Sequence, residues 1–590
     1  MKWIYKNIDY SVVNDIVQTC NNNEILAMVL YNRGITDAKE AAGAMCPSMN
    51  NFRDLTLMKD VKKAFELLKW AIDNKLGIGI CGDYDVDGVM STTILYKAIV
   101  QLGGRVCFHL PHRIKEGYGI NKSAVDEFNK RGCKLIITCD NGISAIDEML
   151  YAHQLGIKTI ILDHHEPKLC VENGIENEII PVADAVIDAK QSACTYEFKQ
   201  MCAGGMCYRF VKAFYEYLGV ELKSDKELLI FASMATVCDI VDLLDENRLI
   251  VKLGLEYIND TCENKGLKGL IEASIPKKSN ITEYSYGFIL GPCINAAGRL
   301  NSAADAVRLF ISNNDNEIND LALYLYNQNN ERKELTENAV NEILSELEGK
   351  ALDKVMVIYN EHIHESIAGI VAGRIKDKFY RPVIMLTSSN GTVKGSARSI
   401  DGYNIFQELS RQADLLEKFG GHSMAAGLSL KQENIEKLRL ALNNECKLKA
   451  EDLIPVFNVD AVLDFSQISL SKVRDFDLLH PFGRGNEEPK FVTKSVQAVG
   501  VRLVGENKDI VQFAFQDENE ISLRGVFFKG ADYLKQLLYE KNMENVWEMV
   551  ENNRQSKLYF TSDILYTLNV NTFNGRSNVQ LNIKDLVIVG

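Results

Sequence analysis

Leu76-Gly77-Ile78-Gly79-Ile80 and, two residues further on, Asp83-Tyr84-Asp85-Val86-Asp87-Gly88 decide the fold of this chain. The first stretch is a short apolar run typical of a buried strand, and the residues that follow Gly88 are typical of a turn into a helix. The three alternating aspartates therefore stand at the carboxyl end of a strand, where open α/β sheets place their active sites. Carboxylates this close raise one another's pKa unless a cation lies between them, so we expect a divalent metal site.

A calcium-binding loop of the EF-hand type is one alternative for this segment. Such a loop needs a glycine at its sixth position and a glutamate at its twelfth. Counting from Asp83, Gly88 falls at position six, but position twelve is Ile94, which offers no oxygen ligand. The EF-hand alternative is therefore excluded, and a solvated turn remains as the other alternative.

The composition is that of an ordinary globular protein. The 590 residues are 46% hydrophobic and 25% charged, and no apolar run reaches the length of a membrane span. The first ten residues lack the apolar core of a signal peptide, and the 14 cysteines show no C-x-x-C pair, so we expect reduced thiols and a cytoplasmic location. The net charge of −14 argues against broad attraction to nucleic acid, although it leaves room for a local basic channel.

Strands and helices alternate after residue 60, which predicts a parallel, doubly wound sheet of the α/β class. The expected strands are 77–82, 106–110, 134–139 and 158–162, and Asn121 is expected to cap the helix that ends near Gly132. A long connecting helix, a second α/β domain and a small β-barrel follow. The expected domains are an N-terminal helical cap (1–60), the sheet domain (61–311), the connecting helix (312–350), the second α/β domain (351–454) and the barrel (455–590).

Polar residues recur where successive predicted strands end. Asp140 follows one strand, Asp163-His164-His165 follow the next, and Asp239 stands in a later apolar segment. About six carboxylate and imidazole ligands are too many for one catalytic ion, so two Mn²⁺ or Mg²⁺ ions roughly 3.5–4 Å apart fit better, and zinc or iron fits less well. Each residue alone is equally compatible with a helix cap, a turn or a packed histidine. Their recurrence along one sheet edge favours the metal site.

These motifs resemble those of a known family. Asp163-His164-His165 matches the triplet that names the DHH phosphoesterases, and the whole chain from about residue 50 onward resembles the RecJ-type single-strand-specific exonucleases of that family. The resemblance implies a DHH domain, a DHH-associated domain and a C-terminal OB-fold barrel. Segments that carry it outside the acidic motifs are Pro111–Gly119, Ile294–Leu300, Gly395–Ser399, Phe419–Gly427 and Leu479–Asn486.

The resemblance also implies the roles of individual residues. Asp85, Asp87, Asp140, His164 and Asp239 would be the metal ligands, with Asp140 as the bridge between two ions. Asp83 and His165 would be further ligands or supports for the ligands. The residues that would line the path of the strand and bind its 5′ phosphate are Arg113, Arg299, Ser396, Arg398, Gly420, Gly421 and His422.

The chemistry of the residues in the second domain also suggests roles without the resemblance. Ser396 and Arg398 alternate on one predicted strand and so face the same side, and arginine suits bidentate phosphate contact. The amides of Gly420-Gly421 are able to form an anion-binding nest. The alternatives are surface ion pairs for the arginines and a plain turn for the two glycines. His364 matches a family histidine at a domain interface, and a helix-capping role is equally compatible with its position.

The expected activity is a metal-dependent 5′→3′ exonuclease. It would degrade single-stranded DNA to 5′-mononucleotides in DNA repair and recombination, by two-metal activation of water and without a protein nucleophile. The expected partners are single-stranded DNA with a 5′ end and, as candidates, a single-strand-binding protein and a helicase; a monomer without membrane contact is expected. The barrel would bind single strands by a basic groove and stacking aromatics, although most of its phenylalanines (Phe491, Phe513, Phe515, Phe527, Phe528) fit the barrel core equally well.

Three departures from the family pattern qualify these expectations. Cys81 stands where relatives often have a histidine, the segment around His364 lacks the usual tryptophan and glycine, and the sequence ends soon after the barrel, which leaves helicase docking open. Two other functions remain as alternatives. One is a DHH phosphodiesterase for short oligonucleotides or cyclic dinucleotides, whose members generally lack the barrel; the other is an inactive DNA-binding scaffold, in which the acidic motifs would have degenerated.

Overall fold

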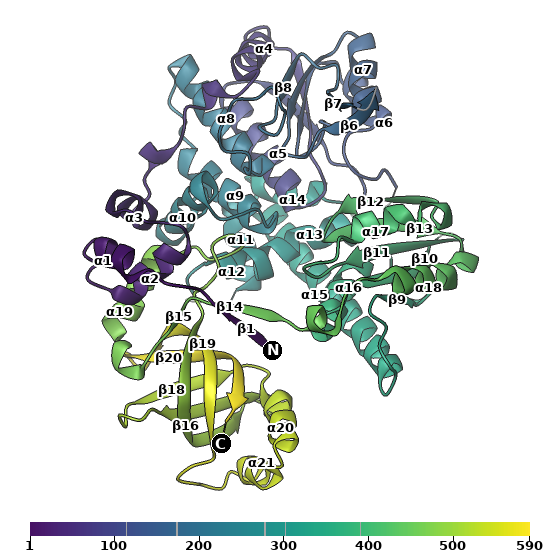
Figure 1. Cartoon of the computed structure of the whole chain (residues 1–590). Coiled ribbons are helices and arrows are strands. Elements are labelled where there is room, and N and C mark those ends of the chain that lie inside the picture. The colour runs from purple at the N-terminus through teal and green to yellow at the C-terminus, as the bar shows by residue number, and fades with distance from the viewer. Residues whose placement is uncertain (114, 173–174, 276–278, 301, 390, 590) are drawn as a thin grey trace. The chain divides into compact units, whose positions relative to one another are not determined.

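The structure is a computed structural model that describes residues 1–113, 115–172, 175–275, 279–300, 302–389 and 391–589 (Figure 1). The chain divides into two compact units. The barrel unit consists of Met1–Ser48, Ile454–Phe482 and Glu487–Gly590, and the sheet unit consists of Met49–Leu453 and Gly483–Asn486. Ile114, in one of the family-like segments, lies outside the described residues.

A five-stranded parallel sheet forms the first half of the sheet unit, which confirms the predicted α/β fold. Its strand order is β3-β2-β4-β5-β8, and every neighbouring pair is parallel. The strands are β2 (Gly77–Cys81), β3 (Arg105–His109), β4 (Cys133–Cys139), β5 (Lys158–Leu162) and β8 (Ala185–Ile187), and a separate hairpin pairs β6 (Lys168–Glu172) with β7 (Ile175–Ile179).

Helices cover both faces of this sheet. Successive side chains of each strand point to opposite faces, so both faces carry apolar side chains that pack against helices. Ile78 and Ile80 of β2 belong to the large core cluster, whereas Cys81 packs in a separate cluster with Phe128. Asn121 caps its helix as predicted, since its side chain accepts a hydrogen bond from the Ala124 amide at 2.9 Å. The helices of this half are α4 (Val61–Asp73), α5 (Val86–Gln101), α6 (Lys122–Lys130), α7 (Ile146–Gln154), α8 (Ala203–Leu218), α9 (Asp225–Cys238), α10 (Asp245–Asp260), α11 (Lys265–Ser274), α12 (Glu283–Ser285), α13 (Gly291–Leu300) and α14 (Ala304–Ile311).

The predicted long connecting helix is α15, Asp315–Leu347, which has 33 residues. It leads to a second five-stranded sheet of order β12-β13-β11-β10-β9, in which only the β9–β10 pair is parallel. The elements are β9 (Met356–Tyr359), β10 (Val383–Ser389), β11 (Thr392–Arg398), β12 (Lys418–His422), β13 (Ala425–Leu430), α16 (Ala368–Phe379), α17 (Ile405–Arg411) and α18 (Ile435–Glu445).

The barrel unit contains a closed five-stranded barrel, which confirms the predicted OB-type fold. Its strands pair in the order β16-β17-β18-β20-β19, and the β16–β19 pairing closes the barrel. Phe491, Phe513 and Phe515 are buried in its core, whereas Phe528 is 58% exposed. The elements are β14 (Val456–Val459), β15 (Ala461–Val462), α19 (Leu470–Arg474), β16 (Phe491–Val504), β17 (Ile510–Gln516), β18 (Ser522–Phe527), α20 (Ala531–Glu540), α21 (Glu544–Glu551), β19 (Phe560–Phe573) and β20 (Arg576–Ile588).

The N-terminal segment differs in part from the helical cap expected for residues 1–60. It contains α1 (Tyr10–Val17), α2 (Glu24–Asn32) and α3 (Ala38–Met45), but it begins with a strand, β1 (Lys2–Tyr5), that pairs in parallel with β14. The three helices share one hydrophobic core with the barrel. Four residues without clear periodicity cannot reveal a strand whose partner is more than 400 residues away. Within the described part of the chain, no helix is both long and apolar enough to span a membrane.

Candidate active site

The three alternating aspartates lie between β2 and α5, as the sequence predicts. Asp85 is the N-cap of α5, because its Oδ1 accepts hydrogen bonds from the amides of Asp87 and Gly88 at 3.0 and 3.2 Å. The capping alternative is therefore realised at Asp85, but it uses only one of the two carboxylate oxygens. Asp83 and Asp87 are almost fully buried. Burial and the nearby charge of Asp85 raise the pKa of Asp83 well above its usual value and that of Asp87 to about 7.

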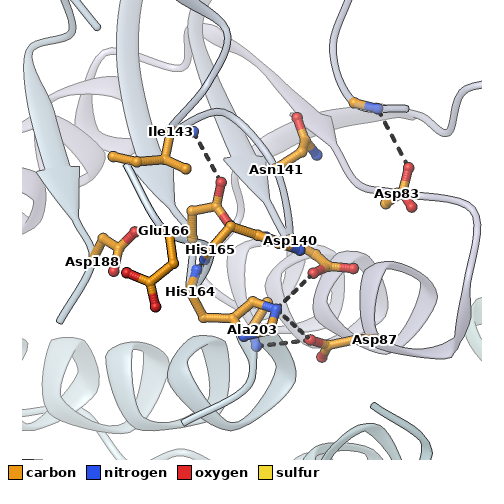
Figure 2. A network of polar contacts seen from close by, with 12 residues as sticks. Asp83, Asp87, Asp140, Asn141, Ile143, His164, His165, Glu166, Asp188 and Ala203 are labelled. Carbon is orange, nitrogen blue, oxygen red and sulfur yellow. Dashed lines mark hydrogen bonds and ion pairs between the residues drawn. The ribbon is translucent and has the colours of Figure 1, made fainter. Parts of the chain in front are cut away.

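The amino end of α8 holds Asp87 in place. The amide of Ala203 donates to Asp87 Oδ2 at 2.9 Å, and the amide of Gly204 donates to Oδ1 at 2.6 Å (Figure 2). Free amides at a helix start attract negative charge, and these two are among the few groups that favour ionisation of this buried carboxylate. Sequence inspection did not find them because α8 begins more than 110 residues after Asp87.

Asp140 follows β4 in a left-handed backbone conformation, with φ of 62°. The Tyr118 hydroxyl donates to the Asp140 carbonyl oxygen at 2.7 Å. The Asn141 side-chain amide donates to the carbonyl oxygens of Cys81 and Cys139 at 3.1 and 2.9 Å, which ties the ends of β2 and β4 together. The loop that carries Asp140 is therefore fixed by polar contacts on both sides. The sequence does not reveal this role of Tyr118 and Asn141, because both act on backbone carbonyl oxygens.

His164 faces the carboxylates with its Nε2 atom. This atom lies 3.2 Å from Asp140 Oδ1, 3.6 Å from Asp87 Oδ2 and 3.8 Å from Asp239 Oδ2. Burial lowers the pKa of His164 to about 3, so the imidazole is neutral at pH 7. A neutral imidazole is the form that binds a metal ion.

His165 points instead towards Asp163, with Nδ1 at 2.7 Å from Asp163 Oδ1. Burial disfavours the charged imidazole, but this hydrogen bond and the surrounding carboxylates prevail and raise the pKa of His165 to about 9. Asp163 also accepts hydrogen bonds from the amides of Ile143 and His164 at 2.9 and 2.8 Å. The aspartate of the triplet therefore orients the His165 imidazole and holds the backbone of His164.

Two clusters of potential metal ligands lie next to each other, and a third group, Asp140, His164 and His165, overlaps both. Asp83, Asp85 and Asp140 form the first cluster, and Asp87, His164 and Asp239 form the second; within each, the potential ligand atoms lie within 4.8 Å of one another. Asp140 belongs to the first cluster and also contacts His164 of the second. Burial and mutual repulsion raise the pKa values of Asp140 and Asp239 well above normal. Oxygen-rich donors that repel one another in this way fit one or two hard divalent cations.

Four of the seven predicted phosphate-binding residues, Arg113, Arg299, Ser396 and Arg398, lie together in a cavity of about 310 Å³. Lys394 and Glu365 also line it. The ion pairs found among the described residues include none from these arginines, whereas Lys394 pairs with Glu365 at 2.8 Å. Burial and the neighbouring guanidinium groups lower the pKa of Arg299 to about 9. Crowded cations without carboxylate partners favour an anionic ligand here.

The other three predicted residues lie apart from this cavity lining. Gly420, Gly421 and His422 are exposed on β12, the edge strand of the second sheet, and pair with Gly427, Ala426 and Ala425 of β13. Gly421 has a φ of 147°, and a side chain there would meet the carbonyl oxygen of Ala425 at 2.4 Å. The backbone at Gly421 therefore requires glycine, while the phosphate role of this segment stays a prediction.

Family models and curated relatives match this arrangement. A model described as the DHH family, N-terminal domain, matches residues 77–236, the DHHA1 domain matches 352–448, and the RecJ OB domain matches 459–585. The single-stranded-DNA-specific exonuclease RecJ of Bacillus subtilis is 35% identical over 593 residues, which cover all of this chain and 71% of that protein. The chain belongs to the RecJ family. A second RecJ, from Haemophilus influenzae, is 28% identical over 98% of both chains.

Solved RecJ structures share the fold. The Mn²⁺ complex of RecJ from Thermus thermophilus superposes with a TM-score of 0.81 at 24% identity and covers 99% of this chain and 79% of that one. A structure of exonuclease RecJ bound to manganese matches at 28% identity with a TM-score of 0.57, over 67% of this chain and 96% of that one. The RecJ OB domain argues against the alternative of a short-oligonucleotide phosphodiesterase, because that alternative predicts a chain without a barrel.

The structure shows the surroundings of Cys81, which departs from the family pattern, and of His364, which matches a family histidine. Cys81 is fully buried in the core cluster that includes Ile120 and Phe128, so its thiol fills the packing on that face of the sheet. His364 Nδ1 lies 2.7 Å from the Ser366 hydroxyl and accepts from the Ser366 amide at 3.3 Å, just before α16. The N-cap of α16 is Ile367, which has no side-chain capping bond, so these contacts order the turn before the helix and His364 does not cap it.

Gly204→Ala tests the support of Asp87 by α8. A Cβ at Gly204 would lie 2.4 Å from the Ala235 Cβ and 3.1 Å from Asp87 Oδ1, so the helix start has to move away from the carboxylate. We expect the Mn²⁺ concentration for half-maximal nuclease activity to rise roughly tenfold, as is typical when a support of a ligand is lost. Gly205→Ala is the matched control, because its Cβ would meet side chains alone, those of Met201 and Ile250 at 3.0 and 3.2 Å and Cys202 Sγ at an ordinary 3.7 Å. An equal response of both variants would contradict the role of the Gly204 amide.

Proposed function

We propose that this RecJ-family chain is a metal-dependent 5′→3′ exonuclease that degrades single-stranded DNA to 5′-mononucleotides in cytoplasmic DNA repair and recombination. The observation that carries the proposal is the pair of carboxylate clusters joined by Asp140. Two ions suit hydrolysis of phosphoesters. The naming of several curated relatives as single-stranded-DNA-specific exonucleases supports the substrate.

The proposed ligands of two Mn²⁺ or Mg²⁺ ions are Asp85, Asp87, Asp140, His164 and Asp239, with Asp83 and His165 beside them. When bound, such ions lower the pKa of a water molecule and offset the charge of the scissile phosphate. The structures of RecJ relatives with Mn²⁺ and Mg²⁺ support the choice of metals. The chemistry of the donors agrees, because oxygens and one neutral imidazole suit hard divalent ions better than thiolate-seeking ones.

The protein's own groups orient this reaction. The α8 amides hold Asp87, Asp163 holds both histidines, and the Tyr118 hydroxyl holds the backbone of Asp140. The cavity with Arg113, Arg299 and Arg398 would hold the terminal phosphate, so that the next phosphodiester is presented to the carboxylates. A cavity that binds a terminal 5′ phosphate favours attack from the 5′ end without requiring the phosphate.

The remaining expectations belong to the same proposal. Domain limits of 1–60, 61–311, 312–350, 351–454 and 455–590 are supported for the last two domains by family matches at 352–448 and 459–585. The RecJ OB domain supports contact with single-stranded DNA. A single-strand-binding protein and a helicase remain proposed partners, and a monomer is the proposed state.

The decisive assay offers the protein a single strand with Mn²⁺ and follows the product length over time. One strand carries a blocked 5′ end, a second a blocked 3′ end, and a third is a duplex of the same sequence. We expect mononucleotides from the 3′-blocked strand alone. Internal fragments, attack on the 5′-blocked strand or equal degradation of the duplex would each refute the proposal.

A further inference from the structure

The turn of residues 363–369, which leads into α16, contacts cations of the arginine-lined cavity. The Ser366 carbonyl oxygen accepts a hydrogen bond from Arg299 Nη1 at 2.8 Å. Glu365 Oε2 lies 2.8 Å from Lys394 Nζ. Arg299 belongs to α13 and Lys394 to β11, so the turn connects cations from two elements that are distant in the chain.

Gly369 brings the same turn close to a further guanidinium of the cavity. Gly369, Ser396 and Arg398 all line the cavity. A Cβ on Gly369 would lie 2.8 Å from Arg398 Nη2 and 2.8 Å from Ser396 Oγ, so the backbone of the turn lies against β11 with no space for a side chain between them. The position of the turn therefore affects where the cavity presents its hydrogen-bond donors.

A single imidazole nitrogen holds the centre of this turn. His364 Nδ1 accepts a hydrogen bond from the Ser366 amide at 3.3 Å and lies 2.7 Å from the Ser366 hydroxyl. Because an amide N–H is able only to donate, Nδ1 carries a lone pair and the ring proton is on Nε2, so the Ser366 hydroxyl donates to Nδ1 as well. Ser366 is 5% exposed whereas His364 is exposed, so the imidazole fixes a buried residue from the surface.

These contacts form a continuous series from the surface to the cavity. His364 holds the amide and the hydroxyl of Ser366, and the Ser366 carbonyl oxygen holds one nitrogen of Arg299. A guanidinium group carries five N–H donors in one rigid plane, so a bond to one nitrogen sets the direction of the other donors. The direction of the Arg299 donors therefore depends on a histidine that does not itself line the cavity.

We propose that His364 is a positioning residue for recognition of the terminal phosphate, because through Ser366 it sets the direction in which Arg299 offers its donors to the cavity. This inference rests on the proposed binding of a 5′ phosphate in the cavity and adds a support outside the cavity lining. A role of His364 in packing alone would affect all strands equally. A positioning role predicts a loss that depends on both the terminal phosphate and Arg299.

The test measures kcat and KM of the full-length protein at saturating Mn²⁺ on one strand prepared with a 5′ phosphate and with a 5′ hydroxyl. We expect His364→Ala to raise KM for the phosphorylated strand roughly five- to tenfold, the effect of losing about one hydrogen bond, and to leave kcat within about twofold. KM for the hydroxyl strand should change less. His364→Asn is the conservative variant, because the oxygen of an asparagine side chain accepts two hydrogen bonds, and it should restore KM to within about twofold of wild type.

The combination with Arg299→Gln decides whether His364 acts through Arg299. The double variant should have a KM for the phosphorylated strand within about twofold of that of Arg299→Gln alone, because the group that His364 positions is already lost. Additive losses would overturn the inference. An equal rise in KM for both strands after His364→Ala would overturn it as well.

His362→Ala is the matched control, because His362 precedes the same turn, its side chain is 78% exposed, and it lies near Glu361 and not near Ser366. Equal KM values for His362→Ala and His364→Ala would contradict the positioning role. Wild-type degradation of a single strand with Mn²⁺ is measured in parallel. Failure of that reaction refutes the proposed function, whereas normal degradation combined with an unchanged KM after His364→Ala refutes the positioning role alone.

Discussion

Asp140→Asn is expected to lower the rate of single-strand degradation at least about a thousandfold, which corresponds to roughly 4 kcal/mol of transition-state stabilisation. The physical reason is that Asp140 belongs to one carboxylate cluster and contacts the histidine of the other, so its loss disturbs both proposed ion sites. The measurement is the initial rate of mononucleotide release at saturating Mn²⁺. A rate within tenfold of wild type would contradict the bridging role.

The same variant provides its own control for folding. Asp140 is buried among carboxylates that raise its pKa, so replacing it by a neutral amide removes repulsion when no cation is present. We therefore expect the melting temperature of Asp140→Asn in chelator to equal or exceed that of wild type. Loss of activity with a lowered melting temperature would indicate damage to the fold instead.

Arg299→Gln is expected to weaken the use of 5′-phosphorylated strands by roughly ten- to a hundredfold in kcat/KM, because it removes a charge-assisted contact to phosphate. Strands with a 5′ hydroxyl should be degraded by the variant and the wild type at similar rates. Arg299 already donates to the Ser366 carbonyl oxygen at 2.8 Å, so the guanidinium is held in position before the ligand arrives. The measurement is competition between the two kinds of strand in one reaction.

Lys394→Gln is the matched control for Arg299→Gln, because Lys394 lines the same cavity but is already paired with Glu365 at 2.8 Å. We expect a smaller loss of kcat/KM on 5′-phosphorylated strands for Lys394→Gln than for Arg299→Gln. An equal loss on phosphorylated and unphosphorylated strands after Arg299→Gln would show that the cavity binds the strand without recognising its terminal phosphate.

Local sequence patterns were sufficient for most of the fold. The apolar strand ending at Cys81, the Asn121 cap and the long helix α15 follow from periodicity and capping preferences within a few residues. The predicted carboxylates and His164 also meet, since parallel strands end at one edge of the sheet. Asp239 was singled out in a later apolar segment of the sequence, and the structure places it at the end of α9 and not at a strand end.

Contacts between residues far apart in the chain could not be predicted from the sequence. The amides of Ala203 and Gly204 that hold Asp87 carry no side-chain signature. Tyr118 acts on Asp140 through a carbonyl oxygen, which any residue would offer.

The pairing of β1 with β14 has a consequence for how this chain folds during its synthesis. Lys2 lies beside Val456, so the barrel unit is built from both ends of the chain, with the sheet unit encoded between them. Ribosomes add about 5–20 residues per second, so the first three helices emerge roughly 20–80 s before their barrel partners exist. The sheet unit is synthesised before the barrel unit is complete, so it is able to fold before the barrel does. During this interval the apolar faces of α1 and α2 lack their final core, which makes the nascent N-terminus a target for chaperones.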